Sequence, residues 1–499
     1  MLTESNIPVP EFLHPTDLSQ LTCRPDPSDV DLRSTGGTST NVVRLFNIYY
    51  PLRSLLLLCG EAFVICCSFV VASRIEFGAD SYLVLNFEYG YYKILAVTGI
   101  AVICSHYFDL YDPERFAEGS LVYFRLMVVL GTFSIILAGL GFCFPRLMLG
   151  KHALLLGLVI LTAALITWRS SYGWLIRRPY LMERIYVLGD SKLAQRLVQA
   201  ISNRPDLGME VAGWADTLTN EFNTRKTLQS NIAAVLKNGQ RVSRIVLAMP
   251  DRRGIPVGQL LNLRLRGVRV EDATTLLEKI SGKIEIDDLH PSWLILSDGF
   301  PIDSAVVAVG SAISILISLA CLILLLPLIL LIALAIKASS LGPVLYRQKR
   351  VGRNGVVFTC YKFRTMRTDA EAGTGPAWAG DDDPRITPIG RILRKIRLDE
   401  IPQLWNVVKG DMALVGPRPE RPEFVKWLSK TIPYYTLRHV IRPGITGWAQ
   451  VNYKYGSSVE DAKEKLKYDL FYIKNMSFGL DLMTLLYTTK VVFLGRGAK

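Results

Sequence analysis

The chain has 499 residues, 50% of them hydrophobic, and carries a formal net charge of +13. A mean hydropathy of +0.27 is too high for an ordinary soluble enzyme of this length, so the sequence predicts a membrane protein with more than one domain. The excess of basic residues favours contact with anionic lipid or anionic substrates. Nucleic acid is not a predicted partner, because no nucleic-acid-binding motif is recognisable.

The first part of the chain predicts a membrane-embedded region. Residues 1–42 are rich in Pro, Ser, Thr and Asp and predict a flexible tail. Residues 43–175 contain four apolar segments, each long enough to span a membrane as a helix. These segments cover about residues 49–73, 92–111, 121–144 and 152–171. Basic residues flank the first and the last segment, so the positive-inside rule places both ends of this four-helix region in the cytoplasm.

Residues 180–300 change to an α/β pattern. The strand pattern "RIYVLGD" runs into "SKLAQRLVQAI", which has a helical period, and further strand patterns follow. This order predicts a Rossmann-like cytoplasmic domain. Its phosphate loop keeps only Gly189 of the glycines that a dinucleotide fingerprint needs. A regulatory or assembly role is therefore favoured over dinucleotide binding, and the ligand of this domain stays open.

Residues 302–337 form a second kind of membrane segment. The stretch 304–336 contains no charged residue, and as one straight helix it would be about 50 Å long, whereas the hydrocarbon core is only about 30 Å thick. A full crossing would also carry the basic stretch 345–399 out of the cytoplasm. We therefore predict a re-entrant helix that is broken at Pro327, with an ordinary kinked span as the alternative.

Residues 338–499 predict a mainly α, small α+β domain. The stretch Val356–Tyr361 predicts a strand, and Lys362 and Arg364 follow it. The next pattern, "DDDPRITPIGRILRKIRLDE", predicts a basic amphipathic helix that lies on anionic lipid and ends at Asp399 and Glu400.

The adjacent carboxylates of Asp399 and Glu400 need compensating charge. Lys362, Arg364 and Arg394 precede them, and the stiff Gly-Pro-Arg-Pro segment brings Arg418. Arginine suits phosphate oxygens, a carboxylate can attack phosphorus, and Mg²⁺ would relieve the repulsion between the two acids while neutralising a diphosphate. The pair therefore predicts phosphoryl chemistry at a membrane surface, with Asp399 and Glu400 as the predicted magnesium ligands.

Four ordered motifs then identify a family. The stretches "KFRTM", "LDEIPQLWNVVKGDMALVGPRPE", "RPGITGWAQVN" and "YDLFYIKNMSFGLDL" resemble the bacterial sugar transferases, which are monotopic phosphoglycosyl transferases. The resemblance runs from about residue 302 to residue 499. The upstream spanning helices and Rossmann-like domain look like the large form of this family.

The resemblance implies a reaction. A sugar-1-phosphate would pass from a UDP-sugar to undecaprenyl phosphate with release of UMP, as the initiating step of exopolysaccharide, capsule or O-antigen synthesis. Such enzymes lie in the bacterial inner membrane with the catalytic domain facing the cytoplasm. Asp399 is the implied nucleophile and Glu400 its assistant. The implied phosphate and nucleotide-sugar ligands are Lys362, Arg364, Arg394, Arg418, Trp448 and Gln450. A homodimer through the upstream domains is compatible with this assignment, and the transferred sugar stays open.

Parts of the sequence are compatible with two other functions. A metal-dependent membrane glycosyltransferase would use the acidic run at residues 381–383, which has Asp-x-Asp spacing but lies in a loop pattern. Such an enzyme releases UDP, whereas a phosphosugar transferase releases UMP. The second alternative is a non-enzymatic scaffold that binds nucleotide sugars through the Rossmann-like domain.

Overall fold

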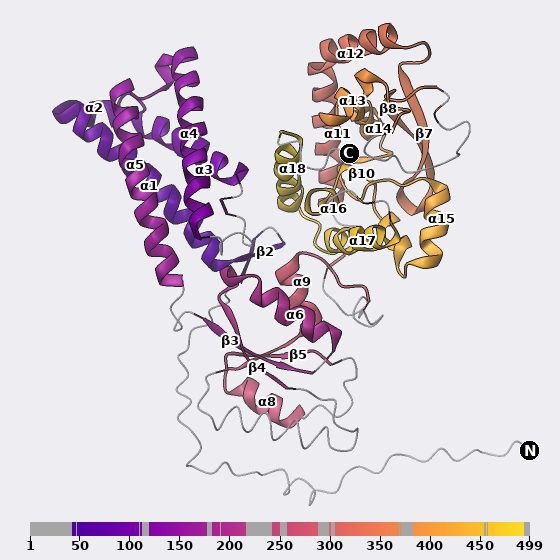
Figure 1. The fold of residues 1–499 in the computed structure, drawn as a ribbon, viewed down its shortest axis with the longest axis horizontal. Helices are drawn as coiled ribbons and strands as arrows, with labels where there is room; N and C mark the ends of the chain where they lie inside the picture. Colours follow the sequence, from indigo (N-terminus) through magenta and orange to yellow (C-terminus); the bar gives the residue numbers. More distant parts are fainter. Residues whose placement is uncertain are drawn as a thin grey trace, which may run out of the picture.

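Figure 1 shows three groups of elements in the computed structural model: a helical bundle, a small sheet with its helices, and a C-terminal unit. The residues that the structure describes are 42–45, 47–108, 110–111, 119–176, 182–189, 191–215, 242–249, 257–287, 299–300, 305–368, 370, 383–453, 456 and 458–493. The predicted tail lies almost wholly outside them.

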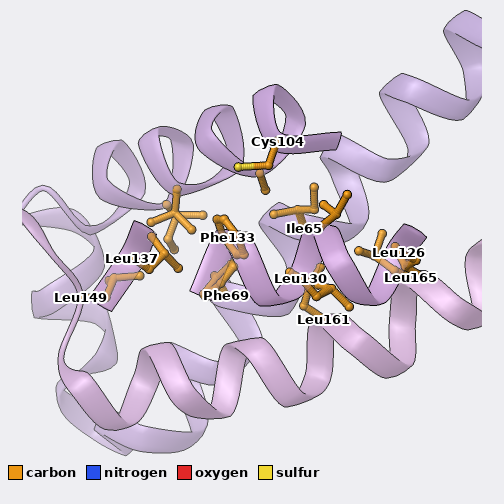
Figure 2. Close-up of a cluster of buried hydrophobic side chains, with 14 of the residues drawn as sticks. Ile65, Phe69, Cys104, Leu126, Leu130, Phe133, Leu137, Leu149, Leu161 and Leu165 are labelled. Carbon is orange, nitrogen blue, oxygen red and sulfur yellow. The ribbon is translucent and has the colours of Figure 1, made fainter. Parts of the chain in front are cut away.

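Four long helices form the N-terminal bundle. They are α1 (Leu52–Phe77), α3 (Gly90–Tyr107), α4 (Gly119–Cys143) and α5 (Lys151–Ile176). In the centre of the bundle, Phe69 and Phe133 meet edge to face with ring centroids 6.4 Å apart (Figure 2). Aliphatic side chains from the same helices surround them, including Ile65, Leu126, Leu130, Leu161 and Leu165.

Four helical stretches among the described residues are long and apolar enough to cross a membrane. They are Leu52–Asn86, Val122–Cys143, Lys151–Leu175 and Val307–Leu324. The predicted segment 92–111 forms α3, which is not one of them, because Lys93 and His106 lie near its two ends. Helix α3 nevertheless packs into the bundle through Ile94 and Val97.

A short hairpin, β1 (Val42–Leu45) and β2 (Ile48–Pro51), precedes the bundle. The sequence predicts a helix from residue 49, but α1 begins only at Leu52, because Pro51 has no amide donor and its fixed φ suits the residue before a helix. Tyr50 packs against the core of the C-terminal unit, so the hairpin connects two parts of the molecule.

A parallel sheet in the order β4-β3-β5-β6 forms the α/β unit. Its strands are β3 (Glu183–Leu188), β4 (Met209–Ala215), β5 (Arg244–Leu247) and β6 (Arg269–Asp272). Ile185 and Val187 pack against α6 (Lys192–Ser202) and α9 (Ala273–Ser281), whereas Tyr186 and Leu188 pack against α8 (Val257–Leu265). Alternate residues of β3 therefore face helices on opposite sides of the sheet, and the predicted α/β character is confirmed.

The long uncharged segment forms two helices, α11 (Ala305–Leu324) and α12 (Leu326–Ser339). They meet at Leu325, two residues before Pro327, because a proline lacks an amide hydrogen and crowds the carbonyl four residues earlier. Figure 1 shows α12 running across the end of α11 instead of continuing its axis. Only 6% of the apolar stretch of α11 is buried, whereas α12 buries Ile332 and Ile336 against the C-terminal unit.

The C-terminal unit is mostly helical and contains two small pairs of strands. The antiparallel pair is β7 (Leu345–Val351) with β8 (Val357–Phe363), and the parallel pair is β9 (Ala413–Val415) with β10 (Gly444–Thr446). The helices are α13 (Pro388–Lys395), α14 (Gln403–Val408), α15 (Pro422–Thr431), α16 (Trp448–Asn452), α17 (Val459–Lys474) and α18 (Phe478–Phe493).

Buried ion pairs attach the α/β unit to α17. Lys467 Nζ lies 2.7 Å from a Glu285 oxygen, and Lys474 Nζ lies 2.8 Å from a Glu278 oxygen. Each of these four side chains is at most 10% exposed. Lys283 also pairs with Glu464 and Lys463 with Asp287. Helix α18 in turn contacts the bundle, where Tyr107 donates a hydrogen bond to Thr489 at 2.8 Å.

Candidate active site

Asp399 and Glu400 lie on the turn between α13 and α14. Helix α13 ends at Lys395, Arg397 takes a left-handed conformation with φ of 57°, and a 3₁₀ helix follows at Leu398–Glu400. The prediction that the acids end the basic helix is therefore off by one turn. Pro402 occupies the position just before α14.

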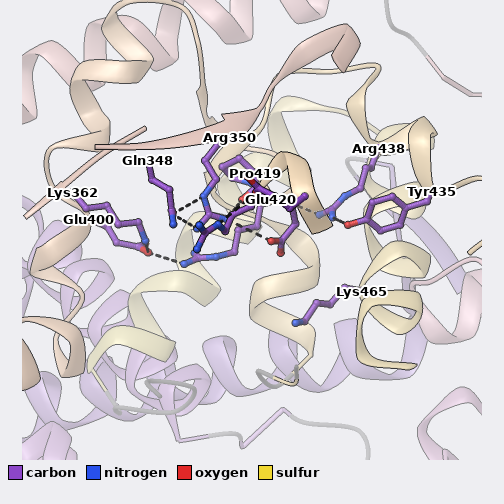
Figure 3. Close-up of polar contacts among 12 residues, drawn as sticks. Gln348, Arg350, Lys362, Glu400, Pro419, Glu420, Tyr435, Arg438 and Lys465 are labelled. Atoms are coloured by element: carbon purple, nitrogen blue, oxygen red, sulfur yellow. Dashed lines mark hydrogen bonds and ion pairs between the residues drawn. The ribbon is translucent and has the colours of Figure 1, made fainter. Parts of the chain in front are cut away.

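The carboxylate of Glu400 accepts hydrogen bonds from two cations (Figure 3). Its Oε1 lies 2.8 Å from Lys362 Nζ and 2.8 Å from Arg418 Nη2. Burial alone would raise the pKa of Glu400, but Arg418 and Lys362 outweigh this effect and hold the pKa well below its usual range. Glu400 is therefore ionised, and one of its oxygens is already occupied.

Asp399 is in a different state, although it is the neighbouring residue. Its carboxylate is buried, at 8% exposure, yet among the described residues it makes no ion pair or hydrogen bond. Burial raises the pKa of Asp399, the Glu400 charge adds to this, and Lys362, Arg394 and Arg418 oppose it. Asp399 thus has a carboxylate that no described residue pairs with or hydrogen-bonds, and basic side chains surround it.

The two cations on Glu400 come from the two strand pairs. Lys362 lies in β8, in register with Tyr346 of β7. Because side chains alternate along a strand, Gln348 and Arg350 lie on the same face of the hairpin as Tyr346. Lys362 was predicted to follow its strand, and instead it lies within β8.

Arg418 follows β9 in the Gly-Pro-Arg-Pro loop. Strands β9 and β10 are parallel, so this loop and α16 both leave from the same edge of the pair. The two segments approach closely: a Cβ on Gly447 would lie 2.2 Å from the Gly416 carbonyl oxygen. Glycine at position 447 is therefore required for the loop of Arg418 and the helix of Gln450 to lie side by side.

Arg364 and Arg394 lie on the cavity wall but also bind protein groups. Arg364 donates to the Leu341 carbonyl at 3.0 Å and to the Ser340 carbonyl at 2.8 Å, so it caps the C-terminal end of α12. Arg394 Nε donates to Thr365 Oγ1 at 2.9 Å.

Of the two residues predicted to bind the nucleotide sugar, the structure brings only Gln450 to the cavity. Its Oε1 is buried and has no hydrogen-bond partner among the described residues. Trp448 is placed elsewhere. Its Nε1 donates to the Gly282 carbonyl at 2.9 Å, and its ring stacks on Phe471, because the residue lies where α16 meets the α/β unit.

One cavity of about 660 Å³ joins these groups. Among the described residues its wall contains four carboxylates, two lysines and nine arginines. The charged residues are Asp399, Glu400, Glu420, Asp469, Lys362, Lys465, Arg350, Arg364, Arg367, Arg385, Arg394, Arg397, Arg418, Arg421 and Arg438. A cavity of this size, with an excess of positive charge on its wall, suits a small ligand with several phosphate charges.

Sequence reasoning missed Arg350, Arg438 and Asp469, which also line this cavity. Arg438 pairs with Asp469 at 2.8 Å, and the two side chains are 7% and 2% exposed. For Asp469 the sequence does contain a signal, because this acid lies inside the apolar run "YDLFYI" of α17. A charge on a buried helix face indicates a partner, but the sequence does not say which one.

Comparisons with known proteins identify the family of the chain. Residues 307–495 match the family described as "Bacterial sugar transferase". A UDP-N-acetylgalactosamine-undecaprenyl-phosphate N-acetylgalactosaminephosphotransferase of Aeromonas hydrophila is 39% identical over 250 residues, which cover 48% of this chain and 56% of that relative. A UDP-glucose:undecaprenyl-phosphate glucose-1-phosphate transferase of Escherichia coli (strain K12) is 30% identical over 360 residues, covering 69% and 74%.

The similarity also extends upstream of the site. A relative from Xanthomonas campestris pv. campestris, with the same printed name as the Escherichia coli protein, is 29% identical over 492 residues, which cover 91% of this chain and 96% of that relative. The match therefore includes the bundle and the α/β unit. On its motifs, its cavity and these matches, the chain belongs to the bacterial sugar transferase family.

Proposed function

We propose that this enzyme transfers a sugar-1-phosphate from a UDP-sugar to undecaprenyl phosphate, releasing UMP, as the initiating step of exopolysaccharide, capsule or O-antigen synthesis. The relatives supply the substrate classes, because their names describe this transfer with glucose and with N-acetylgalactosamine. The reaction would proceed through a covalent phosphosugar on Asp399.

The unequal state of the two acids carries the proposal. Glu400 is ion-paired to Lys362 and Arg418, whereas Asp399 is uncommitted on the wall of the same cavity. A nucleophile must be free to attack, and a residue that organises cations must be paired. We therefore assign Asp399 as the nucleophile and Glu400 as the residue that holds Lys362 and Arg418 near the transferring phosphate.

The two chemical steps balance. A carboxylate oxygen of Asp399 attacks the phosphorus that bears the sugar, and the bond from this phosphorus to the UMP oxygen breaks, so UMP leaves with that electron pair. An oxygen of undecaprenyl phosphate then attacks the same phosphorus. The bond to Asp399 breaks, which regenerates the carboxylate and releases the lipid diphosphate sugar. Arg418 and Lys362 would stabilise the charge on the phosphoryl oxygens in both steps.

Magnesium is part of this proposal. The described residues contain no cluster of three or more His, Cys, Asp or Glu side chains that could hold a metal alone. Mg²⁺ commonly binds through one or two carboxylates and completes its shell with substrate phosphates and water. Asp399, whose carboxylate is uncommitted, and Glu400, of which the two cations occupy only Oε1, fit such a site. When bound, the ion would neutralise diphosphate charge.

The membrane arrangement is also proposed. The exposed apolar surface of α11 requires lipid, and the turn into α12 would return the chain to the side from which it entered. In this re-entrant form the protein would lie in the bacterial inner membrane. Its catalytic unit and its Rossmann-like α/β unit would both face the cytoplasm, where UDP-sugars are present.

The glycosyltransferase alternative loses support at its acidic run. Asp383 pairs with Arg385 at 2.6 Å and accepts the Arg385 amide at 3.0 Å, so it closes a local turn. The other two acids, at positions 381 and 382, lie outside the described residues.

Asp399→Asn tests the mechanism. The variant keeps the shape and removes the nucleophile, so UMP release from UDP-glucose or UDP-N-acetylgalactosamine should be abolished. The wild-type enzyme should release UMP before any lipid acceptor is added and should gain the mass of one hexose or N-acetylhexosamine phosphate. Near-normal turnover by Asp399→Asn, or UMP release that strictly needs the lipid, would replace the covalent route by direct transfer.

A further inference from the structure

The backbone of the Gly-Pro-Arg-Pro loop is held through its carbonyl groups. Pro417 and Pro419 have no amide hydrogen, so the loop has few backbone donors with which to anchor itself. Four consecutive carbonyl oxygens, from residue 417 to residue 420, instead accept hydrogen bonds from other parts of the chain. The donors in this order are Gly444 N at 3.0 Å, Arg438 Nη2 at 3.0 Å, Arg350 Nη1 at 2.9 Å and Val351 N at 2.9 Å.

Two of these four donors are arginine side chains, and they bind neighbouring carbonyl groups of the Gly-Pro-Arg-Pro loop (Figure 3). Arg438 binds the carbonyl of Arg418 itself, and Arg350 binds the carbonyl of Pro419. The side-chain end of Arg418 contacts Glu400 at 2.8 Å. Arg418 is thus fixed at both ends, by Arg438 at its backbone and by Glu400 at its guanidinium group.

Arg438 is itself rigidly held. It pairs with Asp469 of α17 at 2.8 Å and donates to the Tyr435 hydroxyl at 2.7 Å. Three partners on one planar guanidinium leave little rotational freedom, which a lysine ammonium on a flexible stem could not reproduce. Asp469 and Arg438 are both largely buried, so removing either partner leaves the charge of the other uncompensated.

We propose that Arg438, oriented by Asp469, is a positioning residue that fixes where Arg418 lies relative to the transferring phosphate. The proposal rests on the function proposed above, and it adds that α17 takes part in catalysis indirectly. Misplacement of a phosphate-binding arginine by about 1 Å is enough to cost on the order of a hundredfold in rate.

Arg438→Lys tests the proposal in the full-length enzyme in detergent. Lysine keeps the charge opposite Asp469 but cannot also reach the Arg418 carbonyl and Tyr435. We expect the rate of UMP release in a single turnover to fall by about 10- to 100-fold, with little change in the KM for the UDP-sugar. Arg347→Lys is the matched control, since Arg347 lies on the outward face of β7, and it should leave the rate unchanged.

A double-mutant cycle separates positioning from a general structural role. If Arg438 acts only through Arg418, Arg438→Lys should cost less than about twofold in an Arg418→Gln background. A full and additive loss in that background would overturn the proposal, as would a normal rate in Arg438→Lys alone.

Asp469→Asn provides a second variant in case Arg438→Lys does not fold. It should reproduce the loss of rate and the same dependence on Arg418, although the loss of one partner of a buried pair should also lower its thermal midpoint. A loss of rate that stays in full in the Arg418→Gln background would overturn the positioning role. Failure of the proposed function itself looks different, because the wild-type enzyme would then release no UMP.

Discussion

The attachment of the α/β unit to α17 can be tested at one buried pair. In Glu278→Gln, Lys474 keeps its charge but loses the carboxylate that lies 2.8 Å away. The two side chains are 4% and 10% exposed, so water does not screen the pair. Removing one partner of a buried pair costs about 3–5 kcal/mol, and the lower end applies because the glutamine oxygen still accepts a hydrogen bond.

A loss of about 3 kcal/mol should lower the thermal midpoint by roughly 6–12 °C, at about 2–4 °C per kcal/mol. Differential scanning fluorimetry of purified protein would measure it. The matched control is Glu210→Gln, which removes an exposed pair with Arg184 at 3.6 Å and should cost less than about 1 kcal/mol. Replacing both partners, Glu278→Leu with Lys474→Met, should cost less than Glu278→Gln alone. Equal midpoints for the two single variants would refute the buried-pair reasoning.

Two further predictions concern pH and topology. Burial raises the pKa of Asp469 to about 6, against the effects of Arg438 and Lys465, so the acid loses its charge as pH falls through 6. A carboxyl group whose pKa is raised in the folded protein stabilises the folded state at low pH, so Asp469 should not lower the folding stability there. UMP release should nevertheless decline below pH 6, because the neutral Asp469 holds Arg438 less firmly. The Asp469→Asn variant should lack this part of the pH profile. The topology can be tested with single cysteines that replace Ser202 or Lys430 in a background without native cysteines. Neither cysteine should react with a membrane-impermeant thiol reagent applied from the periplasmic side. Labelling of position 430 alone would contradict the re-entrant helix.

The candidate site was predictable where its residues lie in short motifs. The Asp-Glu pair, the lysine of "KFRTM" and the arginine of "GPRP" are each marked by unusual neighbours. The structure brings all of them into one cavity. What the sequence could not show is which acid is paired, because the contacts of Glu400 with Lys362 and Arg418 join residues 38 and 18 positions away. The same limit applies to Arg438 and Asp469, whose contact depends on how α17 packs.

The fold was predictable where composition alone decides it. Apolar length indicated the bundle helices and the segment around Pro327, and strand patterns indicated the sheet. The parallel pair of β9 and β10 was not predicted, because each strand has only three residues and the pair depends on close approach at Gly444 and Gly447. The hairpin at the start of the bundle was missed because the apolar pattern continues through Pro51.

Helix α17 connects the α/β unit to the active site, so this unit can affect the site even if its poor phosphate loop binds no nucleotide. One side of the helix gives Lys467 and Lys474 to acids of the α/β unit, and another gives Asp469 to Arg438. Both lysines are buried against these acids, so the docking of the α/β unit and the placement of α17 depend on the same side chains. Docking therefore constrains the helix that orients Arg438, which is a physical route by which the upstream part of the chain can influence phosphosugar transfer.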